Sequence, residues 1–192
     1  GAGGGRSSIL QYPHALLGAL CILVYVGAEA MAGDAIGTYG ASFGLPLDHT
    51  KFFTSLTLGA MLLGYVVGLL TIPRVLSQER YLALSAVLGV LLTLGAFATH
   101  GYVSVAFVAA LGFANAMMWP AIFPLAIQGL GRFTEKGSAL LIMGIAGGAV
   151  VPQLFVLLKE TMDFQLVFLL LMVPCYLYIL FFAVRGHRVG RG

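Results

Sequence analysis

The chain has 192 residues, of which 60% are hydrophobic and only 9% charged, and its mean hydropathy is +1.00. A water-soluble domain of ordinary composition cannot bury that much apolar surface, so the composition excludes a soluble domain and favours a protein dissolved in lipid. The net charge of +3 is explained by membrane topology and by contact with anionic lipid headgroups, and it gives no argument for a nucleic-acid partner.

Six long apolar stretches follow one another along the chain, separated by short turns. A helix needs about 20 apolar residues to cross a bilayer core of about 30 Å, and these runs are continuous, whereas the strands of a membrane barrel alternate polar and apolar residues. We therefore predict an all-α, polytopic membrane protein of antiparallel transmembrane helices, at about residues 15–43, 52–73, 81–99, 101–131, 137–158 and 164–184.

The ends of the chain differ in character from the middle. Residues 1–12 begin with a glycine-rich run and predict a flexible tether, either an inter-half linker or an artificial addition. Residues 13–184 form the transmembrane domain, and residues 185–192 form a basic cytoplasmic tail.

Lysine and arginine are distributed unevenly between the two sides of the membrane. An even number of spans puts both termini on one side, and translocated loops carry fewer cations. One side has only Lys51 and Lys159, whereas the other has Arg6, Arg74, Arg80, Arg132, Lys136, Arg185, Arg188 and Arg191. Both termini are therefore expected in the cytoplasm.

Small residues recur at four-residue spacing on three spans, which lets helix backbones approach closely in lipid. These stripes are Gly33 and Gly37, then Ala60, Gly64 and Gly68, then Gly144 and Gly148. They serve either plain packing or sliding contacts in a protein that changes shape. Two spans are expected to bend: the first is glycine-rich in its outer half, and the fourth contains Pro120 and Pro124.

Glu29 is the most informative single residue, because it lies roughly 20 Å into the first helix, past the middle of the bilayer. A charge at that depth is costly, so Glu29 should face a cavity, accept hydrogen bonds from neighbouring helices, or carry a proton. It is either a structural partner or a contact for substrate or ion. Asp34 lies five positions further on, about 140° round the helix, so the two carboxylates are not expected on one face. Asp34 could equally cap broken backbone.

Asn115 and Trp119 on the fourth span have the spacing of residues on one helix face. An amide beside a flat aromatic ring suits a sugar, whose hydroxyls form the hydrogen bonds and whose apolar face stacks. The same pair also serves as interhelical packing in many membrane helices. Tyr25 and Tyr39 would add hydroxyls, and Gln153 and Asp34 are secondary candidates.

Enzyme functions find little support. His14, His49, His100 and His187 all lie at membrane edges or in loops, so no histidine base is available at depth for an intramembrane protease. No metal-ligand cluster, phosphate-binding loop or cofactor fingerprint occurs, so we expect no catalytic residue, metal or cofactor. Cys21 and Cys175 lie inside predicted spans, where they are expected to pack.

Three segments, YVGAEAMAGD at 25–34, NAMMWPAIFPLAIQGLG at 115–131 and KGSALLIMGIAGGAVVPQL at 136–154, resemble the fucose/galactose/glucose proton symporters of the major facilitator superfamily. The glucose/galactose transporter branch is the most similar. The resemblance covers all six helices but corresponds only to the C-terminal six-helix half of a twelve-helix fold.

The resemblance implies symport of a hexose held at the membrane midplane between two halves, by alternating access. It implies that Glu29, Asn115, Trp119 and Tyr25 contact the sugar. Trp119 stands where the fucose branch has a tyrosine, which leaves the choice of sugar open. The implied partners are the hexose, a coupling ion that is a proton or sodium, the lipid bilayer, and the other six-helix half or another membrane subunit.

Two alternatives to a half of a symporter remain. The chain could be a six-helix structural or accessory subunit of a membrane complex without transport activity. It could also be a half-size transporter that pairs with itself.

Overall fold

The computed structural model describes residues 11–190 and contains only helices and turns in that part of the chain. Residues 1–10, with most of the predicted tether and Arg6, and Arg191 and Gly192 lie outside the described residues. Six segments of the described chain are long and apolar enough to cross a membrane, so the predicted all-α, polytopic fold class is confirmed.

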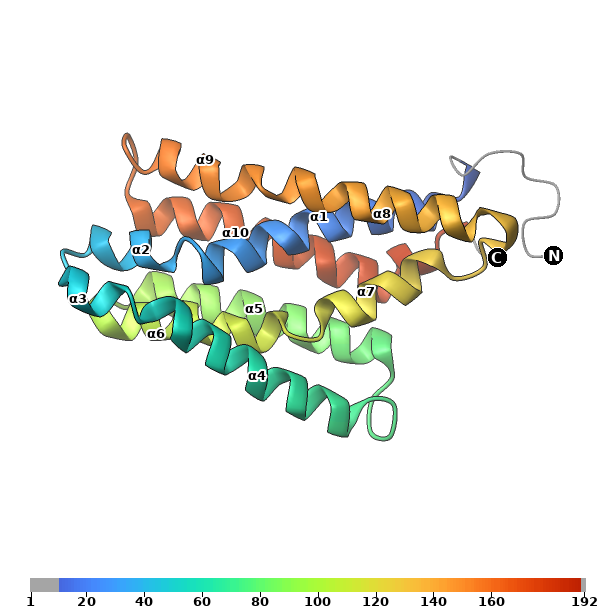
Figure 1. The fold of residues 1–192 in the computed structure, drawn as a ribbon, viewed down its shortest axis with the longest axis horizontal. Helices are drawn as coiled ribbons and strands as arrows, with labels where there is room; N and C mark the ends of the chain where they lie inside the picture. The colour runs from blue at the N-terminus through green and yellow to red at the C-terminus, as the bar shows by residue number, and fades with distance from the viewer. Residues whose placement is uncertain (1–10, 191–192) are drawn as a thin grey trace.

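Helices and short 3₁₀ turns follow one another along the described chain. They are α1 (Pro13–Gly33), α2 (Ile36–Ser42), α3 (Leu47–Thr50), α4 (Phe53–Thr71), α5 (Gln78–Ala98), α6 (Gly101–Asn115), α7 (Met118–Ile127), η2 (Gly131–Phe133), α8 (Thr134–Gly148), α9 (Val150–Leu158), α10 (Phe164–Val184) and η3 (Gly186–Arg188). Consecutive spans run antiparallel, and the start of α1 and the end of α10 lie at the same end of the bundle (Figure 1).

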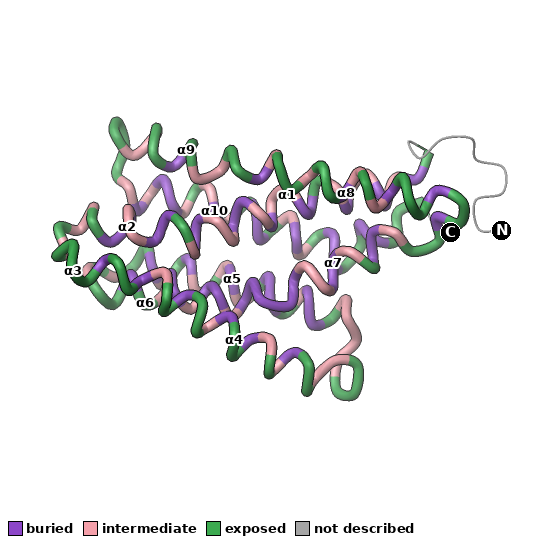
Figure 2. Tube along the Cα trace, viewed as in Figure 1, coloured by how far each residue is buried: buried purple, intermediate pink, exposed green. Residues whose placement is uncertain are grey.

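The spans differ in how deeply they are buried. Within the most apolar window of each, 67% of the α6–α7 span and 50% of α1 is buried, but only 22% of the α3–α4 and η2–α9 spans. The most extensive contacts between helices are those of α10 with α5, α4 with α6 and α1 with α8. Figure 2 shows the same division, with buried segments gathered on the central helices and exposed ones alternating along α4 and α9.

The first span is interrupted between α1 and α2, where its glycine-rich sequence predicted a weak helix. An interrupted helix leaves carbonyl oxygens without amide partners, and lipid supplies none. Two threonines of α4 supply hydrogen-bond donors in place of the missing amides. Thr57 Oγ1 donates to the Ala32 carbonyl at 2.8 Å, and Thr54 Oγ1 donates to the Gly33 carbonyl at 2.8 Å. The break is therefore held by a neighbouring helix.

The fourth span is interrupted at Ala116 and Met117, between α6 and α7. Pro120 has no N–H to donate to the Ala116 carbonyl, which accounts for the break at this position. Asn115 and Trp119 are consequently on different helices, and the prediction that they share one helix face is wrong. The fifth span has a weaker irregularity at Ala149, which the sequence analysis did not predict, four residues before Gln153 and three before Pro152.

Glycines allow close helix contacts at two of the three predicted stripes. A Cβ at Gly64 would lie 2.7 Å from both the Ala116 Cβ and the Phe113 carbonyl oxygen, and one at Gly148 would lie 2.8 Å from the Leu23 carbonyl oxygen. The first stripe is different: a Cβ at Gly33 meets nothing within 4 Å, and one at Gly37 meets only a Thr50 atom at 3.9 Å. The prediction of close contact is wrong for Gly33 and Gly37.

A buried polar network closes the bundle at the end opposite the start of α1. The Tyr39 hydroxyl lies 2.6 Å from Ser104 Oγ, which donates to the Ala96 carbonyl at 2.6 Å. Gln165 Nε2 donates to the carbonyls of Ala96 and Thr99 at 3.1 and 2.7 Å. These bonds serve the carbonyls at the C-terminal end of α5, so Tyr39 has a structural role here.

We expect Thr57→Val to lower the free energy of unfolding by about 1–3 kcal/mol, because it leaves the buried Ala32 carbonyl without a partner. Thermal unfolding of the purified protein in detergent measures the change. Thr93→Val is the matched control: Thr93 is also buried but donates to the Gly89 carbonyl of its own helix, so its loss should cost less. Equal effects of the two substitutions would contradict the role of Thr57.

We expect Gly64→Ala to destabilise the protein by about 1–3 kcal/mol, because the new methyl group overlaps Ala116 and Phe113. Gly59→Ala is the control on the same helix, since a Cβ there meets nothing within 4 Å. It should be neutral or stabilise by up to about 1 kcal/mol through helix propensity. Unfolding in detergent compares them, and a stabilising Gly64→Ala would rule out the close contact.

Candidate functional site

A cavity of about 230 Å³ lies between α1 and α4, on the side of the interrupted first span. Glu29 and Asp34 are its charged residues, Thr54 is polar and already bonded to the Gly33 carbonyl, and the rest of the wall is apolar. The lining residues are Val26, Glu29, Ala30, Gly33, Asp34, Thr54, Leu58 and Met61.

Glu29 is partly buried and is surrounded by tyrosines from three helices. Tyr25, one turn earlier on α1, lies on the same face of the helix and beside Glu29. The hydroxyls of Tyr65 on α4 and Tyr176 on α10 are within electrostatic range of the same carboxylate. Tyr65 follows the lining residue Met61 by one helical turn, so it lies on the face of α4 that borders the cavity.

Asp34 and Glu29 both line this cavity. Asp34 is the C-cap residue of α1, which ends at Gly33. The backbone N–H of Asp34 donates to the Ala30 carbonyl at 2.7 Å, so Asp34 continues the geometry of α1, and its side chain is exposed. That the two carboxylates do not form a pair on one helix face stays a prediction.

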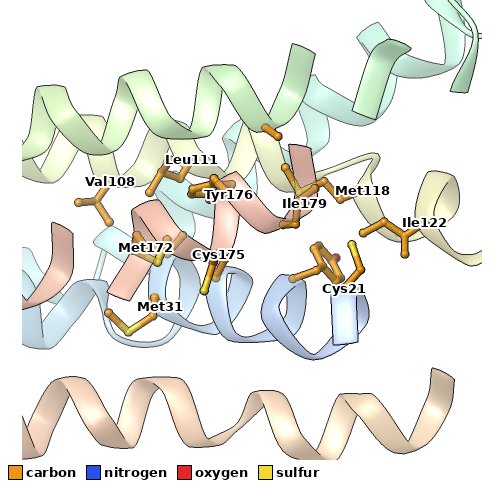
Figure 3. Close-up of a cluster of buried hydrophobic side chains, with 14 of the residues drawn as sticks. Cys21, Met31, Val108, Leu111, Met118, Ile122, Met172, Cys175, Tyr176 and Ile179 are labelled. Carbon is orange, nitrogen blue, oxygen red and sulfur yellow. The ribbon is translucent and has the colours of Figure 1, made fainter. Parts of the chain in front are cut away.

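Asn115 is fully buried at the end of α6. Its Oδ1 accepts a hydrogen bond of 2.7 Å from the hydroxyl of Tyr176, which is itself fully buried. Asn115 is not among the residues that line the cavity. Figure 3 shows Tyr176 in the core beside Leu111 of α6.

Trp119 and Gln153 lie away from Glu29. Trp119, on α7, is partly buried and packs against Phe123 with ring centroids 5.3 Å apart. Gln153 is exposed on α9, on a separate hollow bordered by Pro152, Leu157 and Glu160. The structure thus places Tyr25 beside Glu29, and Asn115, Trp119 and Gln153 are not among the residues that line this cavity.

Tyr65, Tyr176, Thr54 and Thr57 are the site-forming residues that the sequence analysis missed. The two threonines carried a weak signal, because hydroxyls in a membrane span commonly bond to a neighbouring helix. Tyr65 and Tyr176 carried none, since a tyrosine in an apolar stretch reads as packing. Within the described residues no group of three or more His, Cys, Asp or Glu side chains could hold a metal ion.

Comparison with known proteins gives close sequence relatives. The chain is 34% identical over 190 residues to a glucose/galactose transporter of Brucella abortus (strain 2308), covering 95% of the chain and 45% of that protein. It is 29% identical over 188 residues to a putative glucose/galactose transporter of Helicobacter pylori, covering 46% of that protein. The chain therefore spans about half the length of the curated relatives it matches. No family model matches it.

Solved structures give the fold. The chain superposes with a TM-score of 0.82 and 23% identity on the major facilitator superfamily transporter FucP in its outward conformation, over 90% of the chain and 42% of that structure. A single-substitution variant of the Escherichia coli fucose:proton symporter FucP gives the same values. The chain has the fold of one six-helix half of a major facilitator superfamily transporter, and the resemblance found in the sequence is confirmed.

We expect the cavity between α1 and α4 to contain water when the protein is in a membrane. In Leu58→Cys the new thiol lines the cavity and should react with a charged, lipid-insoluble thiol reagent, since only a hydrated thiolate is nucleophilic. Leu56→Cys is the control: leucines 56 and 58 are 56% and 53% exposed, but they lie on opposite faces of α4. Buried Cys21 and Cys175 should stay unreactive. Equal labelling at 56 and 58 in proteoliposomes would contradict a hydrated cavity.

Proposed function

We propose that the chain is the C-terminal six-helix half of a secondary active symporter that carries a glucose- or galactose-like hexose by alternating access. The observation that carries this proposal is the match of 95% of the chain to glucose/galactose transporters. A cavity with a membrane-embedded carboxylate supports it, because such residues in membrane proteins are usually functional. The protein is then a transporter rather than an enzyme.

The chemistry of the cavity suits a sugar. The Glu29 carboxylate accepts hydrogen bonds from sugar hydroxyls, and Tyr25 lies beside it. The apolar wall of Val26, Leu58 and Met61 suits the C–H face of the ring. Trp119 and Asn115 reach the sugar once α7 moves relative to α6 at the break between them, and Asp34 and Gln153 are secondary candidates.

A second six-helix half is the partner that this function requires. The two least buried spans, Leu47–Thr71 and Gly131–Leu158, offer apolar surface for it. An accessory subunit without transport is not favoured, because the relatives are named as transporters. A proton or a sodium ion drives uptake, and collapse of the proton gradient or removal of sodium distinguishes the two.

The membrane orientation follows from the cations of the described chain. Arg74, Arg80, Arg132, Lys136, Arg185 and Arg188 lie at the end of the bundle where α1 begins, whereas Lys51 and Lys159 lie at the other. By the positive-inside rule both termini are cytoplasmic, in the inner membrane of a bacterium.

The test is hexose uptake in a bacterial strain that lacks glucose and galactose uptake. We expect uptake when the chain is co-expressed with the N-terminal half of the Brucella abortus transporter, and none from either half alone. Co-purification of the two halves shows that they assemble. An assembled pair that takes up neither sugar would refute the proposed function.

In the active pair we expect Glu29→Gln to lower uptake at low sugar concentration by about 10- to 100-fold, the loss of one hydrogen bond to a charged group. Trp119→Ala should raise the half-saturating sugar concentration by about tenfold through loss of stacking. Glu160→Gln, an exposed carboxylate away from the cavity, is the control. Normal uptake by both site variants at normal expression would refute the assignment of Glu29 and Trp119 to the site, but it would not refute the proposed transport function.

A further inference from the structure

The amide of Asn115 is bonded at only one of its two polar ends. Its Oδ1 accepts from the Tyr176 hydroxyl at 2.7 Å, whereas its Nδ2 has no hydrogen-bond partner among the described residues. Both side chains are fully buried. A buried donor left unbonded is costly, and most such donors in proteins find an acceptor. This atom is therefore a candidate for bonding to something other than the helices around it.

The Tyr176 hydroxyl determines which end of the amide stays free. An asparagine side chain offers one acceptor oxygen and two N–H donors, and rotation about its last bond exchanges them. By donating to Oδ1, Tyr176 fixes this rotation and leaves both N–H groups of Nδ2 for an acceptor. A sugar hydroxyl oxygen is such an acceptor, and lipid and apolar side chains are not.

The position of the pair connects it to the cavity. Tyr176 lies close enough to Glu29, which lines the cavity, and to Tyr25 to interact electrostatically with both. Asn115 is the last residue of α6, directly before the break at Ala116 and Met117. The hydrogen bond that Asn115 accepts comes from α10, which is not part of this break.

We propose that Tyr176 is a positioning residue of the sugar site: it orients Asn115 so that Nδ2 donates to a hydroxyl oxygen of the bound hexose. This inference rests on the proposed function. Because Asn115 is buried in this conformation, the contact forms when the backbone moves at the break between α6 and α7. Tyr176 itself does not touch the sugar, so its removal affects binding through the orientation of the Asn115 amide.

Tyr178 provides a matched control on the same helix. Its hydroxyl also donates one hydrogen bond of 2.7 Å to another helix, but to the Leu17 backbone carbonyl. Tyr176→Phe and Tyr178→Phe each delete one hydroxyl from α10 and should lower the unfolding temperature similarly. Only Tyr176→Phe should raise the half-saturating hexose concentration, by about five- to tenfold, with the maximal uptake rate per assembled pair within about twofold.

Asn115→Ala tests the route of the effect in the same assay. If Tyr176 acts only through Asn115, the double variant Tyr176→Phe, Asn115→Ala should bind hexose no more weakly than Asn115→Ala alone. The inference is overturned, with the proposed function intact, if Tyr176→Phe behaves like Tyr178→Phe or if the two effects simply add. If the assembled unsubstituted pair takes up no hexose, the proposed function and this inference fail together.

Discussion

Two hydrogen bonds from α4 stabilise the end of α1, and the interruption of the first span depends on them. The hydroxyls of Thr54 and Thr57 donate to the carbonyls of Gly33 and Ala32, where the first span is interrupted. In lipid an interrupted helix survives only if other protein groups bond to its free carbonyls. Because α4 supplies these groups, α1 can stop at Gly33, and the cavity beside Glu29 is walled by the same two helices that the bonds connect.

The other helix contacts depend on the absence of side chains. Gly64 allows α4 to approach Ala116 and Phe113 at the end of α6, so the irregular backbone between α6 and α7 is covered by a helix and not by lipid. Gly144 and Gly148 do the same for α8 against α1: added Cβ atoms would lie 2.8 Å from the carbonyl oxygens of Ala19 and Leu23. Broken helices and close glycine contacts thus occur together, which is the combination expected where segments move against one another.

The buried polar residues divide into two groups with different tasks. Tyr39, Ser104 and Gln165 close a network whose acceptors are backbone carbonyls of α5, so their bonding capacity is used within the fold. Glu29 lines a cavity, and Asn115, which is bonded to Tyr176, keeps an unbonded donor among the described residues. The first group therefore stabilises one end of the bundle, whereas the bonding capacity of Asn115 is not fully used within the fold.

The sequence by itself determined that the chain belongs in a membrane and how many spans its described residues form. These properties are additive along the chain: hydropathy over about 20 residues decides whether a helix crosses the bilayer, and distance along a helix follows from residue count. The bends at Gly33 and near Pro120 could also be predicted from the sequence, because glycine and proline weaken a helix at their own position. The glycine spacing at Gly64 and Gly148 predicted close contacts correctly.

Only the tertiary structure decided which polar groups meet. The carbonyls at the interrupted end of α1, beside the cavity that Glu29 and Asp34 line, accept hydrogen bonds from two threonines more than 20 residues away along the chain. The separation of Asn115 from Trp119 depends on the end of α6. The pairing of Asn115 with Tyr176 joins residues 61 positions apart, and no local pattern encodes it. Such contacts arise from the packing of whole helices, so the sequence named individual candidates while the fold determined their partners.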